Sequence, residues 1–277
     1  MRGITTGVSA MVLLLVIVCN GVQADPIEKG NDYTISLPGK VKLKMVWIKP
    51  GTFTMGSPKD ELGRESDEVQ HEVTLTQGYW LGKYEVTQEQ YKAILGRPIE
   101  NGDNYPVDHI SWDDAIEFCE KLTARESETG RLPKGYEYTL PTEAQWEYAC
   151  RAGTTTALNS GKNLSDKIKC PEMGEVGWYE NNAYDNDKHP VGQKKPNAWG
   201  LYDMHGNVWE WCSDRYGDYP ASSVTDPEGP DNGSSRVLRG GSWYSSADRC
   251  RSAYRFNYYP SYSYDFSGFR VALSPVQ

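Results

Sequence analysis

The stretch Arg236–Leu273 reads RVLRGGSWYSSADRCRSAYRFNYYPSYSYDFSGFRVAL. Both of its ends are formulaic: RVLRGGSW opens it and GFRVAL closes it. Between them, residues 244–267 contain no Lys, Glu, Gln, Met or Trp, although roughly five residues of these types would be expected from the composition of the chain. Tyr, Ser, Asp, Asn, Phe and Arg dominate instead. We therefore interpret residues 244–267 as a segment under a separate compositional constraint.

Two interpretations of this segment compete. The first is an aromatic-rich region of loops and strands that packs into a core, and composition alone favours it. The second is a binding surface, because Tyr gives rigid amphipathic contact area while Ser, Asn and Asp give adaptable hydrogen bonds, as in antibody combining sites.

Length and charge set broad limits. The chain has 277 residues and 38% hydrophobic content, which suits one large domain or two small ones. Its aromatic content of 12% argues against disorder. Its net charge of −9 argues against a nucleic-acid partner, which would require a basic face.

The N-terminus has the pattern of an export signal. Arg2 precedes the apolar run Val8–Val18, and Val22–Ala24 resembles a cleavage site, so residues 1–24 are predicted to be a signal peptide. The run is too short to favour a permanent membrane span. The alternative is a lipoprotein signal that ends at Cys19, in which case a lipid anchor is the expected membrane contact. Both alternatives predict an extracytoplasmic protein: secreted, periplasmic or anchored at the surface.

Export permits disulfides. Beyond the signal segment the cysteines are Cys119, Cys150, Cys170, Cys212 and Cys250. An odd number leaves at least one thiol unpaired or paired with another molecule. No CxxC pair occurs, which argues against a structural zinc site.

The first part of the chain predicts short strands. Residues 25–40 show no strong pattern and are expected to be an exposed lead-in. Val41–Met55 alternates and is predicted to form two strands around a Pro50-Gly51 turn. Further short strands are expected at 71–76 and 79–85.

Three helix starts are indicated. Thr87 with Gln90 and Thr142 with Gln145 are predicted capping boxes, and Ser111 opens a helix with Asp113 and Asp114 in the first turn, where they suit the helix dipole. The first helix is expected to stop at Gly96 and the third at Gly153. The apolar face of the second is predicted to be Ala115, Ile116, Phe118, Cys119 and Leu122. Residues 154–235 predict long ordered loops with few regular elements.

Short motifs follow one another in a fixed order along the chain. They are MVWI (45–48), GTFTMGS (51–57), YEVT (84–87), PV (106–107), ISW (110–112), LPTEAQWE (140–147), NAWGLYDM (197–204), GNVWEW (206–211), RGGSW (239–243) and GFRV (268–271). Over residues 41–273 this set resembles the formylglycine-generating enzyme (sulfatase-modifying factor) family. The resemblance implies a single α+β domain with a C-type-lectin-like fold and little regular secondary structure.

The same resemblance bears on catalysis. Oxidase members of the family place two cysteines after the Gly-Gly-Ser motif, where they bind copper and a substrate thiol. The corresponding positions here are Ser245 and Cys250. Cu(I) prefers two thiolates, so copper is not expected and the protein is predicted to be non-catalytic. The resemblance further implies a disulfide between Cys212 and Cys250, and leaves the pairing of Cys119, Cys150 and Cys170 open.

The resemblance also implies a structural calcium site. By position, Asp203 and Glu210 would supply carboxylates, and Gly206 and Val208 would supply backbone carbonyls. A hard cation with oxygen ligands suits this set. The alternative is a turn rich in hydrogen-bonding residues.

The C-terminal stretch has a second resemblance, to the variable region of target proteins of diversity-generating retroelements, of the treponemal variable protein type. In these proteins Asn AAC codons are copied with random changes at adenine, which yields codons ending in C and so excludes Lys, Glu, Gln, Met and Trp. The fixed frame matches at Trp243, Cys250, Arg251–Ala253, Pro260 and Gly268–Val271. Non-diversified relatives share part of this frame, so a reverse transcriptase and a near-copy of the stretch beside the gene would decide the matter.

The resemblance favours the binding-surface interpretation and explains the missing cysteine at position 245. The predicted ligand-binding residues are Tyr244, Ser245, Ser246, Asp248, Tyr254, Phe256, Asn257, Tyr258, Tyr259, Tyr262, Tyr264, Asp265 and Phe266. Their aromatic members should be largely solvent-accessible, whereas Trp243 and Phe269 should be core residues.

The expected function is an exported, non-catalytic binding protein, receptor-like or adhesin-like, for an unknown protein or glycan. The alternative is a family enzyme with altered chemistry that uses Cys250 alone, with Ser242 and Trp209 nearby.

Overall fold

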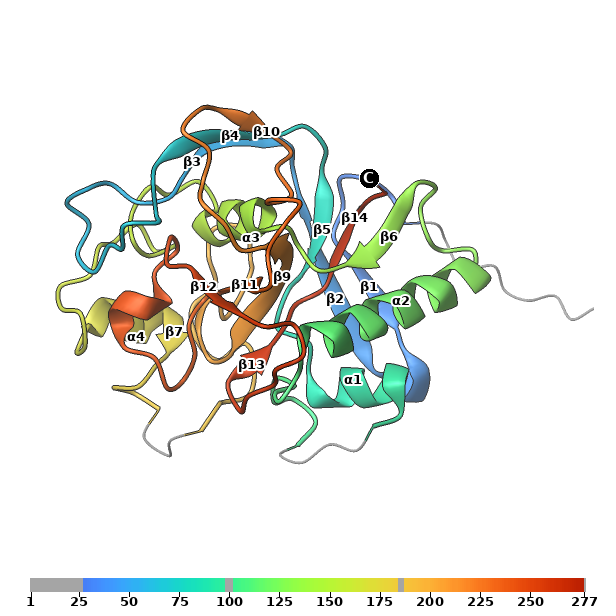
Figure 1. The fold of residues 1–277 in the computed structure, drawn as a ribbon. Coiled ribbons are helices and arrows are strands. Elements are labelled where there is room, and N and C mark those ends of the chain that lie inside the picture. Colours follow the sequence, from blue (N-terminus) through green and yellow to red (C-terminus); the bar gives the residue numbers. More distant parts are fainter. Residues whose placement is uncertain (1–26, 98–101, 184–186, 277) are drawn as a thin grey trace, which may run out of the picture.

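The computed structural model describes residues 27–97, 102–183 and 187–276 (Figure 1). The predicted signal segment 1–24, with Cys19, lies outside the described residues. No helix in the described part of the chain is long and apolar enough to cross a bilayer.

The largest sheet joins the two ends of the domain. Its five antiparallel strands run in the order β1 (Tyr33–Ser36), β2 (Lys42–Ile48), β5 (Tyr79–Gly82), β14 (Ala272–Pro275) and β6 (Tyr136–Thr139). The C-terminal strand therefore lies inside the sheet, between β5 from the first third of the chain and β6 from its middle (Figure 1). The expected lead-in 25–40 was wrong in its second half, because β1 pairs with β2 and a 3-10 turn follows at Pro38–Lys40.

A second sheet contains β3 (Gly51–Met55), β4 (His71–Leu75) and β10 (Val224–Thr225). The two strands predicted within 41–55 are confirmed, but they belong to different sheets: β2 pairs with β1 and β5, and β3 pairs with β4. Residues 56–70 connect β3 to β4 and contain no strand or helix.

The third sheet carries the formulaic stretch. Its order is β12 (Phe256–Tyr258), β11 (Arg236–Arg239), β9 (Trp209–Arg215) and β13 (Ser267–Gly268). The expectation of few regular elements in 154–235 missed the seven-residue strand β9. Its first four residues are all buried, so it lacks the alternation that reveals a half-exposed strand. Nearby are α4 (Pro171–Val176) and the short pair β7 (Gly177–Trp178) and β8 (His205–Gly206).

The three predicted helices form where the capping signals stand. They are α1 (Gln88–Leu95), α2 (Trp112–Glu128) and α3 (Glu143–Arg151), and each begins after a complete capping box at Thr87, Ser111 or Thr142. Gly96 caps α1 with a φ of 70°, as predicted. The left-handed residue that ends α3 is Ala152, one position before the expected Gly153.

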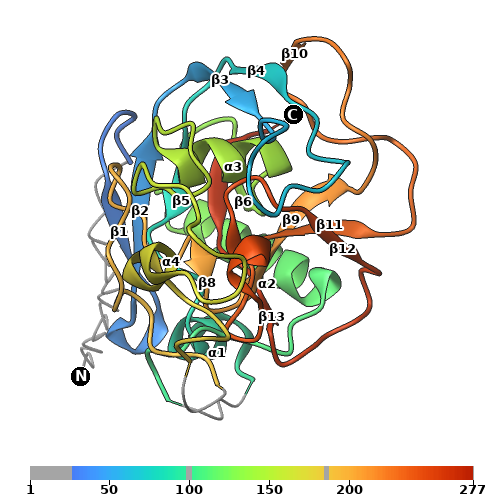
Figure 2. The ribbon, with the colours of Figure 1, turned by 90° about the vertical axis from the view of Figure 1, so that its left-hand side faces the viewer.

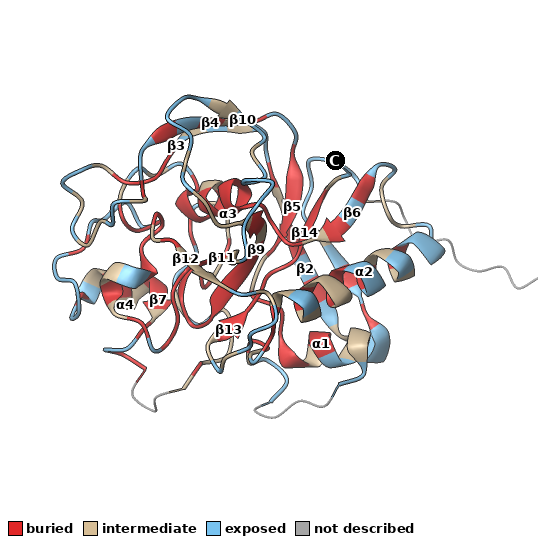
Figure 3. Cartoon of the chain, in the orientation of Figure 1, coloured by how far each residue is buried: buried red, intermediate tan, exposed pale blue. Residues whose placement is uncertain are grey.

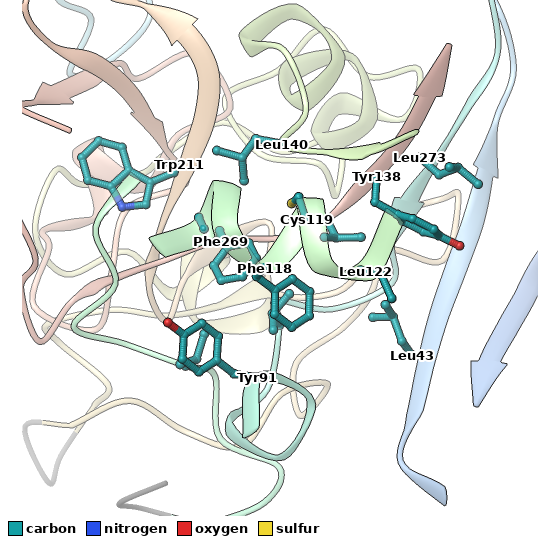
Figure 4. Close-up of a cluster of buried hydrophobic side chains, with 14 of the residues drawn as sticks. Leu43, Tyr91, Phe118, Cys119, Leu122, Tyr138, Leu140, Trp211, Phe269 and Leu273 are labelled. Carbon is teal, nitrogen blue, oxygen red and sulfur yellow. The ribbon is translucent and has the colours of Figure 1, made fainter. Parts of the chain in front are cut away.

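Helix α2 packs its apolar face on the main hydrophobic core (Figure 4). Ala115, Phe118, Cys119 and Leu122 are buried, whereas Ile116 is only partly covered. The Phe118 ring lies 5.3 Å from that of Phe269, which comes from the closing motif of the formulaic stretch. Helix α2 keeps an exposed outer face, whereas α3 is buried along nearly its whole length (Figure 3).

Candidate functional site

The candidate site begins at a tight turn after β11. Gly240 and Gly241 have φ values of 94° and 78°, which non-glycine residues rarely adopt. A Cβ atom at Gly241 would lie only 2.4 Å from the sulfur of Cys250. This turn leads through Ser242 and Trp243 to a 3-10 turn, η2 (Ala247–Cys250), and then to β12. The two glycines therefore let the chain fold back closely over Cys250.

The formulaic residues form a buried frame, which we define as Trp243, Cys250–Ala253, Arg255 and Gly268–Val271. Trp243 is 9% exposed and Phe269 is fully buried, so both are core residues as predicted. Three buried arginines hold this frame to distant segments. Arg251 pairs with Glu61 and Glu68, Arg255 pairs with Glu143, and Arg270 pairs with Glu210.

The aromatic residues between the frame positions lie at the surface or at the edge of the main core. Tyr244, Tyr259 and Tyr262 are 66%, 53% and 48% exposed. The other five aromatics of the predicted set are partly covered and none is buried: Tyr254, Phe256, Tyr258, Tyr264 and Phe266. The expectation of largely accessible side chains is thus met in full by three residues and in part by five. We call these eight side chains the aromatic face.

Ring contacts join the members of the aromatic face between Phe256 and Phe266, whereas Tyr244 packs on Trp243. The hydroxyls of Tyr258 and Tyr264 lie 2.6 Å apart, and the Tyr258 ring is 5.2 Å from that of Tyr262. The Tyr264 and Phe266 rings stack 5.1 Å apart. At the other end Trp209, 5% exposed, packs beneath Tyr254 and Phe256. Most of these rings thus contact one another, and Trp209 of β9 packs beneath Tyr254 and Phe256.

The predicted polar ligand-binding residues divide into two groups. Asp265 is exposed, and Ser246, Asp248 and Asn257 are partly exposed. Ser245 is buried, which corrects its assignment to the surface. Its hydroxyl oxygen accepts a hydrogen bond from the Ser242 amide at 3.1 Å and lies 3.1 Å from the Ser242 hydroxyl, so it closes the glycine turn.

Comparison with known proteins now identifies the family. The model of the sulfatase-modifying factor enzyme 1-like domain matches residues 38–275. The chain belongs to the formylglycine-generating enzyme (sulfatase-modifying factor) family. The structure has the low helical content and the C-type-lectin-like fold expected for this family.

Two curated relatives illustrate the range of the family. The chaperone protein LppX of Paenibacillus barcinonensis is 33% identical over 221 residues, which cover 66% of this chain and 75% of that protein. The formylglycine-generating enzyme of Streptomyces coelicolor is 37% identical over 189 residues, which cover 65% of this chain. The match spans 54% of that enzyme's length.

Two solved structures share nearly the whole fold. Treponema denticola variable protein 1 superposes with a TM-score of 0.76 and 32% identity, over 88% of this chain and 99% of that one. PvdO of Pseudomonas aeruginosa gives a TM-score of 0.74 and 28% identity, over 90% and 99% of the two chains. This sulfatase-modifying factor homologue thus has the fold of a variable protein, as the formulaic stretch indicated.

The predicted Cys212–Cys250 disulfide is wrong. The five cysteines in the described residues are free and buried. Cys212 lies on β9 in a cluster with Val237 and Ala272, whereas Cys250 lies on η2 in a separate cluster with Met173 and Ala247. The two cysteines therefore belong to different parts of the core, and packing rather than a covalent bond holds each in place.

The environment of Cys250 does not activate its thiol. Burial raises the pKa of Cys250 far above its ordinary value, and a backbone contact to the Ser242 carbonyl, with the sulfur 3.9 Å from the oxygen, offsets this only in part. A nucleophilic or copper-binding cysteine needs the thiolate form. Cys250 shares its buried cluster with Met173 and with Cys170, whose thiol is also free and buried.

The two carboxylates of the predicted calcium set differ in the hydrogen bonds that they already accept. Both carboxylate oxygens of Glu210 accept hydrogen bonds from Arg270, at 2.5 and 2.6 Å, and one also accepts from the Trp146 indole at 2.7 Å. Asp203 accepts from the Gly192 amide through one oxygen, and its other oxygen is buried without a hydrogen-bond partner. No group of three His, Cys, Asp or Glu side chains suited to a metal occurs among the described residues.

Of the predicted set, Asp203 thus offers a spare carboxylate oxygen, while Glu210 is committed to Arg270. Burial raises the pKa of Asp203 to about 6, and burial also raises that of the neighbouring Glu85 well above its usual value. Calcium binding stays a prediction for metal analysis of dialysed protein. Sequence reasoning missed the Arg270–Glu210 pair because the two residues lie 60 positions apart.

Proposed function

We propose that this protein is an exported, non-catalytic binding protein that presents a diversified surface on the sulfatase-modifying factor fold. The observation that carries the proposal is the aromatic face. Eight aromatic side chains from one compositionally restricted segment are exposed or half-exposed, four of them packed on the edge of the main core, while the formulaic residues on either side of them are buried. A binding surface on a rigid scaffold requires this division.

The chemistry of the former catalytic positions supports a non-catalytic role. Ser245 stands where the oxidases have the first cysteine, and its hydroxyl completes the turn at Ser242. Cys250 retains a buried, neutral thiol. The enzyme alternative requires Cys250 to react alone, and the low polarity around its sulfur opposes ionisation.

The likeness to a treponemal variable protein supports the binding role, because the two chains share 32% of their residues over 88% of this chain. The N-terminal pattern of residues 1–24 supports export, and the similarity to LppX is consistent with an extracytoplasmic setting. The ligand is a protein or a glycan that contacts the aromatic face.

Ligand selection tests this proposal. A phage-displayed random peptide library and a glycan array would be screened with wild-type protein and with a variant in which Tyr244, Tyr259 and Tyr262 are replaced by Asn. Truncated aromatic hot spots cost about 2 kcal/mol or more, so selected ligands should bind the variant at least about 30-fold more weakly. Equal binding to both proteins would remove the aromatic face from the function.

A separate assay addresses catalysis. Purified protein would be incubated with copper and a cysteine-bearing peptide, and the peptide would be examined for formylglycine by mass spectrometry. We expect no product. Product that disappears in a Cys250→Ala variant would establish the enzyme alternative.

A further inference from the structure

The loop between β3 and β4 lies against the variable stretch. We define residues 60–67 as the acidic loop; its sequence is DELGRESD. A Cβ atom at Gly63 would lie 2.5 Å from the Cβ of Asp248 on η2, so the two segments touch. Figures 1 and 2 both show this loop next to the orange-red turn of η2. Nearly 190 positions separate Arg251 from the loop carbonyl that it binds.

Arg251 fixes the acidic loop in place. Its guanidinium donates to the Gly63 carbonyl at 2.6 Å, to Glu61 at 2.6 Å, and to both oxygens of Glu68 at 2.6 and 2.8 Å. The Ser57 hydroxyl donates to Glu68 from the other side at 2.5 Å. Since the buried partners of Arg251 lie at both ends of the loop, binding a ligand would cost little ordering of this segment.

The outer side of the acidic loop is open to solvent beside the aromatic face. Leu62 is 39% exposed, and Asp60 and Glu65 are also exposed. Arg255 donates to the Asp67 carbonyl at 3.4 Å, and the Arg251 guanidinium that holds the loop lies 5.8 Å from the centre of the Tyr254 ring. The loop thus continues the aromatic face past Tyr254 with an apolar side chain and carboxylates.

The combined surface carries more negative charges than positive ones. Neither residues 60–67 nor residues 244–267 contain Lys. In these two segments the exposed or half-exposed carboxylates without an ion-pair partner among the described residues are Asp60, Glu65, Asp248 and Asp265. Arg64 and Arg249 are the arginines there that are not buried. The side chain of Glu61 is buried against Arg251, and Asp67 accepts a hydrogen bond from the Tyr216 hydroxyl and lies 4.0 Å from Arg255, so four carboxylates remain against two arginines.

We infer that the acidic loop is a fixed second half of the binding surface and that the partner is a protein segment bearing Arg or Lys. Tyrosine faces attract cations through their π systems, and rim carboxylates steer and orient the same charges. The inference rests on the proposed binding function and deepens it: the diversified residues would choose among partners, while Leu62, Asp60 and Glu65 would set their common chemistry.

The test uses a short fluorescein-labelled peptide of alternating Arg and Gly, with a Glu–Gly peptide for comparison, and follows fluorescence anisotropy. Wild-type protein should bind the Arg peptide, with affinity that falls as salt rises, and should not bind the Glu peptide. The double variant Asp60→Lys with Glu65→Lys should weaken binding at least tenfold. Glu120→Lys with Glu128→Lys, both exposed on α2, is the control of equal net charge.

The outcomes separate the two proposals. Loss of binding in the loop variant but not in the α2 control supports the composite surface. Equal loss in both variants, or no binding of the Arg peptide, overturns the inference. If ligands selected on the wild type lose affinity when Tyr259 and Tyr262 change but not when Asp60 and Glu65 change, the composite surface is wrong while the aromatic face keeps its function. Circular dichroism of each variant would verify folding.

Discussion

Within residues 243–271, residues of the frame and residues of the aromatic face are interspersed. Arg251 and Arg255 are buried, and Tyr254 between them is half-exposed. On either side of the face, Trp243 and Phe269 are in the core while Tyr244 and Phe266 are not buried. Side chains of the frame and side chains of the aromatic face are therefore only one to three positions apart.

The difference lies in what each side chain contacts. Frame residues make ion pairs and ring contacts with segments far away in sequence, such as Arg251 with Glu68 and Phe269 with Phe118. Members of the aromatic face mostly contact one another, as Tyr258, Tyr262 and Tyr264 do. A change at Tyr262 or Tyr264 is therefore expected to disturb mainly other members of the face, whereas Tyr254, Phe256, Tyr258 and Phe266 also touch the main core.

The largest expected effect is on the frame. Phe269→Ala should lower the free energy of unfolding by about 3–5 kcal/mol, because it leaves a cavity against Phe118 and Tyr91 in the main core. Urea unfolding followed by tryptophan fluorescence measures this. Phe266→Ala is the matched control from the aromatic face; a cost equal to that of Phe269→Ala would show that the two regions do not differ.

Removal of a frame arginine should cost a similar or slightly smaller amount. Arg251→Ala leaves the buried carboxylates of Glu61 and Glu68 without their cation, which typically costs about 3–5 kcal/mol. Arg249→Ala, two positions earlier and exposed, should change stability by no more than about 0.5 kcal/mol. Chemical denaturation of both variants compares them, and a stable Arg251→Ala protein would contradict the assigned role.

A third prediction concerns pH. Burial, and then the neighbouring Glu143, raise the pKa of Asp214 from 3.8 to about 7. A carboxyl with a raised folded pKa is more easily protonated in the folded state, so wild-type stability should fall as pH rises from about 4 through about 7.

Asp214→Asn keeps an oxygen that can accept from the Glu143 amide, as Asp214 now does at 2.8 Å, but it cannot ionise. Relative to wild type, the variant should gain at most about 4 kcal/mol between pH 4 and pH 8. The comparison of the two proteins cancels the other titrating groups. If the difference in stability between the variant and wild type does not change with pH, the pKa of Asp214 is not raised in the folded protein.

Local signals in the sequence predicted much of the fold. Capping boxes at Thr87, Ser111 and Thr142 depend on residues three apart, and all three helices formed there. The motif order predicted the family and the fold. Strand β1 was missed because its stability comes from pairing with β2 rather than from its own pattern.

The candidate site was harder to predict from the sequence, because it depends on contacts between residues that are far apart in the chain. The link between Arg251 and the acidic loop joins residues 183 or more positions apart, and no local pattern reports it. The burial of Ser245 follows from the fold-back at Gly241, which brings its hydroxyl to Ser242. Composition marked the aromatic face as a set but could not show that Tyr254 is half-covered while Tyr244 is open.

The smallest expected effect on stability comes from the most exposed aromatics. Replacing Tyr244, Tyr259 and Tyr262 with Asn removes side chains that are each about half or more exposed, so each change should alter the free energy of unfolding by no more than about 0.5 kcal/mol. Thermal and urea unfolding would measure this against Tyr138→Asn, a buried tyrosine of β6 that donates or accepts a hydrogen bond with Tyr33 at 2.9 Å.

Tyr138→Asn should be strongly destabilising, because it opens a cavity next to Leu273 and Leu122 in the main core (Figure 4). The triple variant should unfold nearly as the wild type does and yet lose the ligands that wild type selects. If the frame and not the exposed tyrosines stabilises the fold, the triple variant should lose ligand binding without losing stability. A triple variant that unfolds as readily as Tyr138→Asn would mean that the exposed tyrosines stabilise the domain, and then the restricted composition of residues 244–267 would need a structural rather than a functional explanation.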